Sequence, residues 1–298
     1  MLTAIILLVD IAFVRNDIPV ETIKQQFTSS NSQYINIDGL NVRYIIEGNG
    51  TPIVLIHGTG ASLETWNDWT KTLVKDSFQV IRLDIPGFGV TGPRNDRNYS
   101  IENYIQVLND FLVQLNIDSF ALAGNSLGGE IAWQYAVAYP NKVTKLILLD
   151  PAGFYNDKAK GSLVFKLAKY KWFANIISRF DTKPLVKKTL QDVYYDDAKI
   201  QDSTILRYQA MSMRTGNRQA FIDRVSNIDR AKHSNIMDLQ IPTLLEWGTE
   251  DELLHISLAD SFTVNKKVQL LKYDKVGHSP QEEIPLQSVQ DAIQFIKY

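Results

Sequence analysis

Segments with the pattern of β-strands and segments with the pattern of helices alternate along most of this chain of 298 residues. The strand-like segments are short apolar runs, which is typical of strands buried on both faces. This alternation predicts an α/β fold, a mostly parallel sheet covered by helices on both faces. The expected strands are residues 34–37, 41–47, 52–56, 79–84, 120–123, 143–149, 242–248 and 268–273, and the expected helices are 62–75, 100–115, 127–139, 256–262 and 285–297.

The alternation stops in residues 155–235, where the pattern is helical and contains no clear strand. We therefore expect a helical cap inserted into a single core domain, whose two parts are residues 34–154 and 236–298. Residues 1–33 are expected to be an apolar segment followed by a linker, because residues 17–32 are polar and rich in turn-forming residues.

The composition excludes few classes of protein, but it limits the chemical groups available for catalysis. The chain is 45% hydrophobic and 21% charged with a net charge of −2, which is ordinary for a globular protein. It carries no basic arm of the kind that binds nucleic acid. With no cysteine, it has neither disulfides nor thiolate chemistry.

Residues 120–129, FALAGNSLGG, place a serine between a buried strand and a helix. Gly124 and Gly128 flank Ser126 in the pattern G-x-S-x-G. A serine on so sharp a turn presents its hydroxyl beyond the sheet, and the small residues two positions away let the backbones pass. The helix that follows presents free N–H groups and the positive end of its dipole at the same place. We therefore predict Ser126 as a nucleophile.

A serine hydroxyl needs a base, and the chain has four histidines. His278 follows the last expected strand, at the sheet edge where the carboxyl ends of parallel strands meet, and is the predicted base. His57 is expected to support the loop after its strand. The two others are weaker candidates: His233 is expected on the surface of the cap, and His255 lies at the start of a short helix.

The base must be oriented by a third group. Asp251 follows the expected strand 242–248 at the same edge and is the predicted acid. Asp150, which follows the strand before it, is a structurally possible substitute.

The oxyanion formed during attack needs two preorganised donors. The backbone N–H of Leu127 at the helix start and that of Thr59 in the loop 57–60 are the predicted pair. The glycine-rich loop could also be interpreted as a dinucleotide-binding motif. This interpretation fails because Leu63 occupies the position of the third glycine of that motif and would block close packing of helix and strand.

These motifs resemble those of the α/β-hydrolase superfamily over residues 34–298, including the order nucleophile, acid, base. Within it, the chain is similar to the lipase and esterase branch that includes membrane-anchored monoacylglycerol lipases. The resemblance implies an eight-stranded sheet and a helical cap over the serine. Meta-cleavage-product hydrolases, which break carbon–carbon bonds, share the elbow but usually carry an aromatic residue after the histidine, where this chain has Ser279. The matching motifs are HGTG at 57–60, DIPGFG at 84–89, GNSLGG at 124–129, GTED at 248–251 and GH at 277–278.

Two features point towards a membrane surface. Residues 2–14 are apolar except for Thr3 and Asp10, a run too short to span a bilayer. Residues 155–190 carry nine Lys or Arg against two Asp, interleaved with aromatic residues, which suits contact with anionic lipid. The alternative interpretations are a packed N-terminal helix and a cap with a solvated basic face, in a cytoplasmic protein.

The sequence therefore predicts a serine hydrolase that needs neither metal nor cofactor and cleaves carboxylic esters of lipid-like or other small molecules. A lactonase or a carbon–carbon hydrolase would use the same residues and stays open. A non-enzymatic binding module is disfavoured because all five motifs are intact. No nucleic-acid partner is expected, and the sequence does not indicate an oligomeric state.

Overall fold

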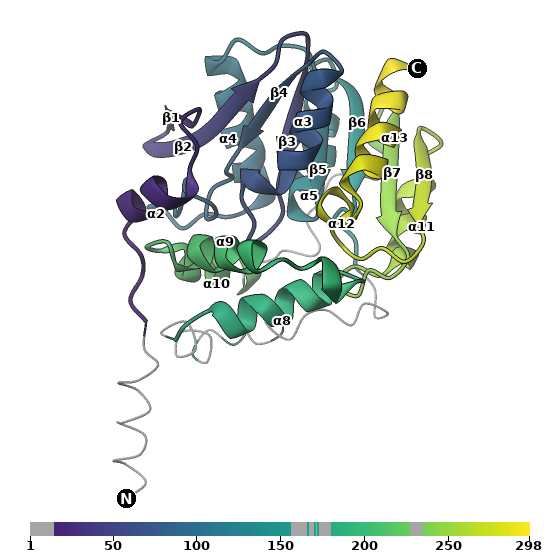
Figure 1. The fold of residues 1–298 in the computed structure, drawn as a ribbon. Helices are drawn as coiled ribbons and strands as arrows, with labels where there is room; N and C mark the ends of the chain where they lie inside the picture. Colours follow the sequence, from purple (N-terminus) through teal and green to yellow (C-terminus); the bar gives the residue numbers. More distant parts are fainter. Residues whose placement is uncertain (1–14, 156–165, 167–169, 171, 173–179, 227–234) are drawn as a thin grey trace, which may run out of the picture.

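The computed structural model describes residues 15–155, 166, 170, 172, 180–226 and 235–298 (Figure 1). The predicted apolar segment 1–14 and His233 lie outside these residues. So does most of the basic stretch between residues 156 and 179.

The described strands form one eight-stranded sheet in the order β1-β2-β4-β3-β5-β6-β7-β8. The pairs β1–β2 and β2–β4 are antiparallel, and the remaining neighbours are parallel. The predicted mostly parallel sheet is thus confirmed. The strands are β1 Gln33–Ile37, β2 Leu40–Glu47, β3 Thr51–Ile56, β4 Phe78–Leu83, β5 Phe120–Asn125, β6 Val143–Leu149, β7 Thr243–Gly248 and β8 Val268–Tyr273.

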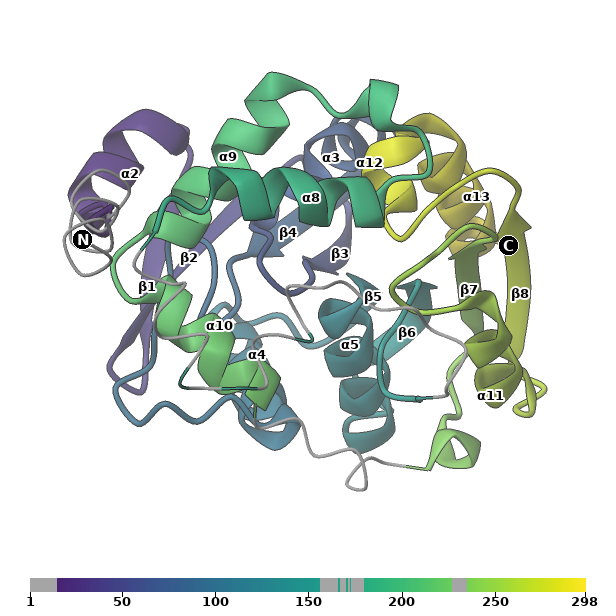
Figure 2. The same ribbon diagram turned by 90° about the horizontal axis from the view of Figure 1, so that it is seen from below.

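Helices cover both faces of the sheet (Figure 2). On one face lie α3 and α13, and on the other lie α4, α5 and α11. The described helices of the core are α3 Asn67–Lys75, α4 Ile101–Gln114, α5 Leu127–Ala138, α11 Ala259–Thr263, α12 Pro280–Glu283 and α13 Pro285–Lys297.

The apolar runs explain this double cover. In β3, Ile53 and Leu55 belong to the core cluster under α3 and α13, whereas Val54 and Ile56 belong to the cluster under α4 and α5. Successive side chains of a strand point to opposite faces, so a strand that is apolar throughout needs a hydrophobic layer on each side.

Three helices of the inserted region lie across the carboxyl ends of the parallel strands (Figure 1). They are α8 Lys183–Val193, α9 Asp202–Met213 and α10 Asn217–Ser226. Ion pairs fasten them to the core: Arg207 to Glu282 at 2.5 Å, Arg97 to Asp223 at 2.6 Å and Arg224 to Glu130 at 3.3 Å. The described part of the cap is therefore attached to the core at several separate points.

The expectation that residues 17–32 are a linker is wrong. Val20–Phe27 forms helix α2, and Ile23 is completely buried in a small cluster with Val90, Ala210 and Met211. Ile18 just before it bonds to the cap, since its N–H donates to the Met213 carbonyl at 2.7 Å. The segment was mistaken for a linker because only a narrow apolar stripe of this helix meets the protein.

Smaller differences concern boundaries. The helix expected at 62–75 begins with a 3-10 turn, Leu63–Trp66, before α3 starts. Strand β5 continues to Asn125, two residues beyond its apolar run. The short helix α12 directly after the histidine loop was not expected.

Candidate active site

Ser126 occupies a strained turn between β5 and α5. Its backbone has φ 56° and ψ −119°, in a region that residues with a side chain rarely adopt. A Cβ atom on Gly124 would lie 2.2 Å from the Gly128 carbonyl oxygen, and one on Gly128 would lie 2.2 Å from that of Ile56. Both glycines are therefore required for the turn. Strain of this kind persists where the surrounding structure enforces it, and it aims the serine beyond the strand end.

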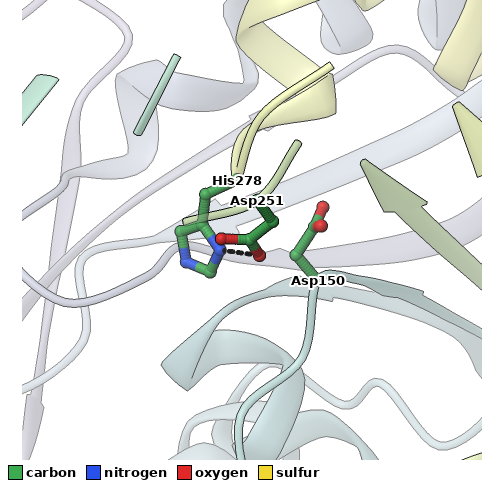
Figure 3. A group of neighbouring side chains, drawn as sticks. All are labelled: Asp150, Asp251 and His278. Atoms are coloured by element: carbon green, nitrogen blue, oxygen red, sulfur yellow. Dashed lines mark hydrogen bonds and ion pairs between the residues drawn. The ribbon is translucent and has the colours of Figure 1, made fainter. Parts of the chain in front are cut away.

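His278 and Asp251 form a buried pair (Figure 3). The His278 Nδ1 nitrogen lies 2.7 Å from Asp251 Oδ2, and the two residues are 5% and 3% exposed. The other carboxylate oxygen, Oδ1, accepts the backbone N–H groups of Leu253 at 2.8 Å and Leu254 at 2.9 Å. These two donors fix the carboxylate, so Oδ2 is directed at the imidazole. Since a carboxylate oxygen can only accept, the Nδ1–H donates and Nε2 is left with its lone pair.

Ser126 and His278 line the same cavity. Asn125 joins their two segments, because its Nδ2 donates to the Leu149 carbonyl at 3.1 Å and to the His278 carbonyl at 2.9 Å. The sequence argument did not assign a role to Asn125. The sequence feature that could have indicated its role is the position of a polar residue at the buried end of a strand, where an amide must find hydrogen-bond partners.

The two predicted oxyanion donors are free. Within the part of the chain that the structure describes, neither the Thr59 N–H nor the Leu127 N–H donates to another group. Leu127 is the first residue of α5, so its N–H has no partner in the helix. The loop that carries Thr59 lies against the serine, since a Cβ on Gly58 would be 3.0 Å from the Ser126 Cβ.

His57 supports this loop from within the core. Its Nδ1–H donates to the Gly58 carbonyl at 2.8 Å, and its Nε2 accepts the Ile85 N–H at 3.1 Å. Burial lowers the pKa of His57, so the ring stays neutral and keeps both bonds. Asp84 fixes the neighbouring segments in the same way, because its carboxylate accepts the N–H groups of Leu63 and Val90 at 2.8 Å each.

The other acid and base candidates have different surroundings. His255 caps a short 3-10 turn and its Nδ1 lies 2.9 Å from the Ser257 hydroxyl. Asp150 is fully buried beside Asp251, and its Oδ1 accepts the Gly248 N–H at 3.0 Å.

Asp150, Asp251 and His278 are also the only cluster in the described residues with spacing suited to a metal ion, each offering an atom within 4.8 Å of the others. The Nδ1 nitrogen that would face such an ion is already bonded to Asp251. We therefore interpret the cluster as a hydrogen-bonded His278–Asp251 pair with Asp150 beside it.

A cavity of about 210 Å³ lies between the core and the cap. Apolar side chains from the cap form much of its wall: Leu185, Val186, Leu190, Met211, Phe221 and Ile222. Sequence reasoning missed these residues, since which side of a cap helix faces the serine depends on how the cap docks.

Arg218 also lines the cavity, but its charge is paired. Its Nε donates to Asp17 at 2.8 Å, and its other two nitrogens donate to the carbonyls of Phe180 at 3.1 Å and Arg15 at 3.0 Å. Among the described lining residues, no Lys or Arg is left unpaired. The site therefore suits an uncharged, apolar ligand better than an anion.

No helix in the described part of the chain has both the length and the apolar character needed to cross a membrane.

Comparison with known proteins places these features in context. A family model described as the alpha/beta hydrolase fold matches residues 51–285. The 2-hydroxy-6-oxo-2,4-heptadienoate hydrolase of Pseudomonas putida is 27% identical over 252 residues, 79% of this chain and 85% of that protein. Monoacylglycerol lipase ABHD6 of Homo sapiens is 28% identical over 264 residues, 84% of this chain and 76% of that protein.

Among solved structures, the meta-cleavage product hydrolase from Pseudomonas fluorescens IP01 is 26% identical and has a TM-score of 0.77. The match covers 89% of this chain and 97% of that one. The names of these relatives give different substrates.

Proposed function

This chain belongs to the α/β-hydrolase family, and we propose that it is a serine hydrolase that cleaves uncharged carboxylic esters through an acyl-enzyme on Ser126. The observation that carries the proposal is the 2.7 Å contact between His278 and Asp251. His278 lines the same cavity as Ser126, which lies on a strained turn. A carboxylate on one nitrogen of an imidazole leaves the other nitrogen ready to accept a proton.

In the first half-reaction, the Ser126 Oγ attacks the ester carbonyl carbon while its proton passes to the His278 Nε2. The carbonyl oxygen becomes an oxyanion, and the free N–H groups of Thr59 and Leu127 donate to it. The C–O bond to the alcohol then breaks, and the imidazolium returns its proton to the leaving alkoxide. Water, activated by the same imidazole, hydrolyses the acyl-enzyme in the second half-reaction.

The cavity wall supports an acyl substrate. Its cap side chains are apolar, and each methylene of an acyl chain buried there contributes about 0.8 kcal/mol. The pairing with Asp17 neutralises Arg218, the only arginine among the described lining residues, so its guanidinium is not free to attract a carboxylate on the substrate. Both features favour an uncharged ester of modest size.

Carbon–carbon hydrolysis is the second candidate, because the Pseudomonas fluorescens structure at 26% identity is named a meta-cleavage product hydrolase. The substrate in the name of the P. putida enzyme, a heptadienoate, is a carboxylate. In the described cavity lining, Arg218 is already paired, so such an anion would have to displace Asp17. We therefore rank this reaction below ester hydrolysis, and ring-opening of lactones, which needs the same groups, remains an arm of the substrate test.

We also propose that the enzyme works at a membrane surface with its cap towards the lipid. The described chain begins on the cap, since Asp17 bonds to Arg218 and Ile18 bonds to Met213. The side chains of Tyr170 and Trp172 in the inserted region are 63% and 69% exposed. Aromatic residues among basic ones suit the boundary between headgroups and acyl chains.

The experiment that tests the nucleophile is labelling with a fluorophosphonate, which bonds covalently to activated serines. Wild type and Ser203→Ala, which changes an exposed serine, should label equally, and Ser126→Ala should not label. Labelling of Ser126→Ala at the wild-type rate, or no labelling of wild type, would refute the proposed function.

The substrate class is tested by kcat/KM on a panel of p-nitrophenyl esters, monoacylglycerols, lactones and a dienoate ring-fission product. We expect esters with apolar acyl groups to be turned over fastest. If the dienoate is preferred, the carbon–carbon reaction replaces the ester reaction.

A further inference from the structure

Asp150, at the end of β6, is held in place by its backbone and by one of its two carboxyl oxygens. Its φ of 43° is left-handed, a conformation that residues other than glycine rarely adopt. Its N–H donates to the Glu246 carbonyl at 3.0 Å, and its Oδ1 accepts the Gly248 N–H at 3.0 Å. Figure 3 shows Asp150 beside the Asp251–His278 pair.

The other oxygen of this carboxyl, Oδ2, is buried, and no donor of the described residues bonds to it. The atoms of Asp150, Asp251 and His278 that face one another lie within 4.8 Å. Two acidic side chains, Asp251 and the buried Glu246, act on the Asp150 carboxyl. Burial, and then the charge of Asp251, raise the pKa of Asp150 well above its usual range.

The surroundings of Asp251 leave room for one more donor. An ionised carboxylate can accept about four hydrogen bonds. Asp251 accepts one each from Leu253, Leu254 and His278, which makes three. No fourth donor to Asp251 is found among the described residues, and Asp150 offers a carboxyl oxygen within 4.8 Å of one on Asp251.

We propose that Asp150 is a positioning residue, a neutral carboxylic acid whose Oδ2–H donates to Asp251 and completes the hydrogen bonding of that carboxylate. The inference rests on the proposed function, because it assigns Asp150 a task in orienting the base. It accounts for two acidic side chains side by side, since two carboxylates at this separation would repel if both were ionised. One proton shared in this way leaves the negative charge on Asp251, the member of the pair that contacts His278.

The test compares Asp150→Leu with Asp150→Asn. Leucine has a similar size but cannot donate, so kcat/KM should fall about 10- to 100-fold, the effect of losing one hydrogen bond to a charged group. The acidic limb of the pH profile should also move to higher pH, because Asp251 then holds the imidazolium more strongly. Asparagine keeps a donor for Asp251 and an acceptor for Gly248, so it should recover most of the lost activity, with the acidic limb at its wild-type position.

A second readout does not depend on turnover. In the infrared, the wild-type protein at neutral pH should show a protonated-carboxyl C=O band that Asp150→Asn lacks. The variant Glu246→Gln is the control, because Glu246 is also buried, its pKa is raised by burial, and its own band must be assigned separately. This measurement stands even if fluorophosphonate labelling fails or if Asp150→Leu does not fold.

Three results would overturn the inference. The first is a wild-type spectrum without a band assignable to Asp150. The second is an acidic limb that moves to lower pH in Asp150→Asn, since only the loss of a negative charge would weaken the imidazolium in that direction. Activation of wild type, but not of Asp150→Asn, by a divalent cation would also overturn it in favour of a metal site.

Discussion

Replacing Asp251 by asparagine tests how the imidazole is oriented. In the wild-type structure, Asp251 Oδ1 accepts two backbone N–H groups, from Leu253 and Leu254. The amide nitrogen of asparagine cannot accept them, so its carbonyl oxygen must take this position. The amide –NH2 then faces the His278 Nδ1, and two donors would oppose each other. The ring is expected to move its proton to Nε2, the tautomer that cannot accept a proton from Ser126.

The size of the effect follows from this geometry. The wrong tautomer in a Ser-His-Asp site lowers kcat about 10⁴-fold, which corresponds to about 5 kcal/mol of the activation barrier. The two backbone bonds to residue 251 are kept, so we expect little change in the melting temperature. Hydrolysis of the best p-nitrophenyl ester under saturating conditions measures kcat directly.

The matched control is Glu250→Gln, the same change of carboxylate to amide at an exposed position of the same loop. It should keep the wild-type kcat. If Asp251→Asn stays within about tenfold of wild type while Asp150→Asn loses the activity, the assignment of the acid is wrong and Asp150 takes that role.

Two further predictions concern the periphery. Ile23→Ala should lower the free energy of unfolding by about 2–5 kcal/mol, because it leaves a cavity under α2; chemical denaturation measures this, with the exposed Gln25→Ala as control. A loss below about 0.5 kcal/mol would mean that α2 is not packed as described. More of the full chain should co-sediment with anionic vesicles than with neutral ones, since four basic residues at about 1 kcal/mol each strengthen binding about a thousandfold. Binding to the anionic vesicles should weaken at high salt and after removal of residues 1–14. Binding that ignores lipid charge and salt would refute the proposed role of the basic cap.

The sequence predicted the structure best where burial restricts which residue types can occupy a position. The strand expected at residues 143–149 ends in a buried apolar run and coincides with β6. The strand expected at residues 268–273 coincides with β8, although Gln269 and Lys272 are exposed at this edge of the sheet. The convergence of strand ends also led to Ser126, Asp251 and His278 as neighbours of one site. The structure brings His278 and Asp251 into contact and puts Ser126 on the same cavity, while their catalytic roles stay predictions.

What the sequence did not reveal depends on contacts between distant segments. Helix α2 has apolar residues at Val20, Ile23 and Phe27, a helical spacing, but no side chain caps its start. Only the docked cap shows why Ile23 is buried. The position of Asn125 between two strand-end loops and the empty side of the Asp150 carboxyl likewise appear only when β6, β7 and the histidine loop are side by side.

The docking of α2 has a consequence for the order in which the chain acquires its structure during synthesis. Ile23 is buried against Met211, so its partner leaves the ribosome much later. At about 5–20 residues per second, the roughly 190 residues between them take about 10 to 40 s to make. During that interval the helix must remain undocked in water. Because α2 has only a few apolar residues, it exposes little hydrophobic surface before it docks. The polar composition that made α2 resemble a linker in the sequence therefore also limits aggregation of the nascent chain.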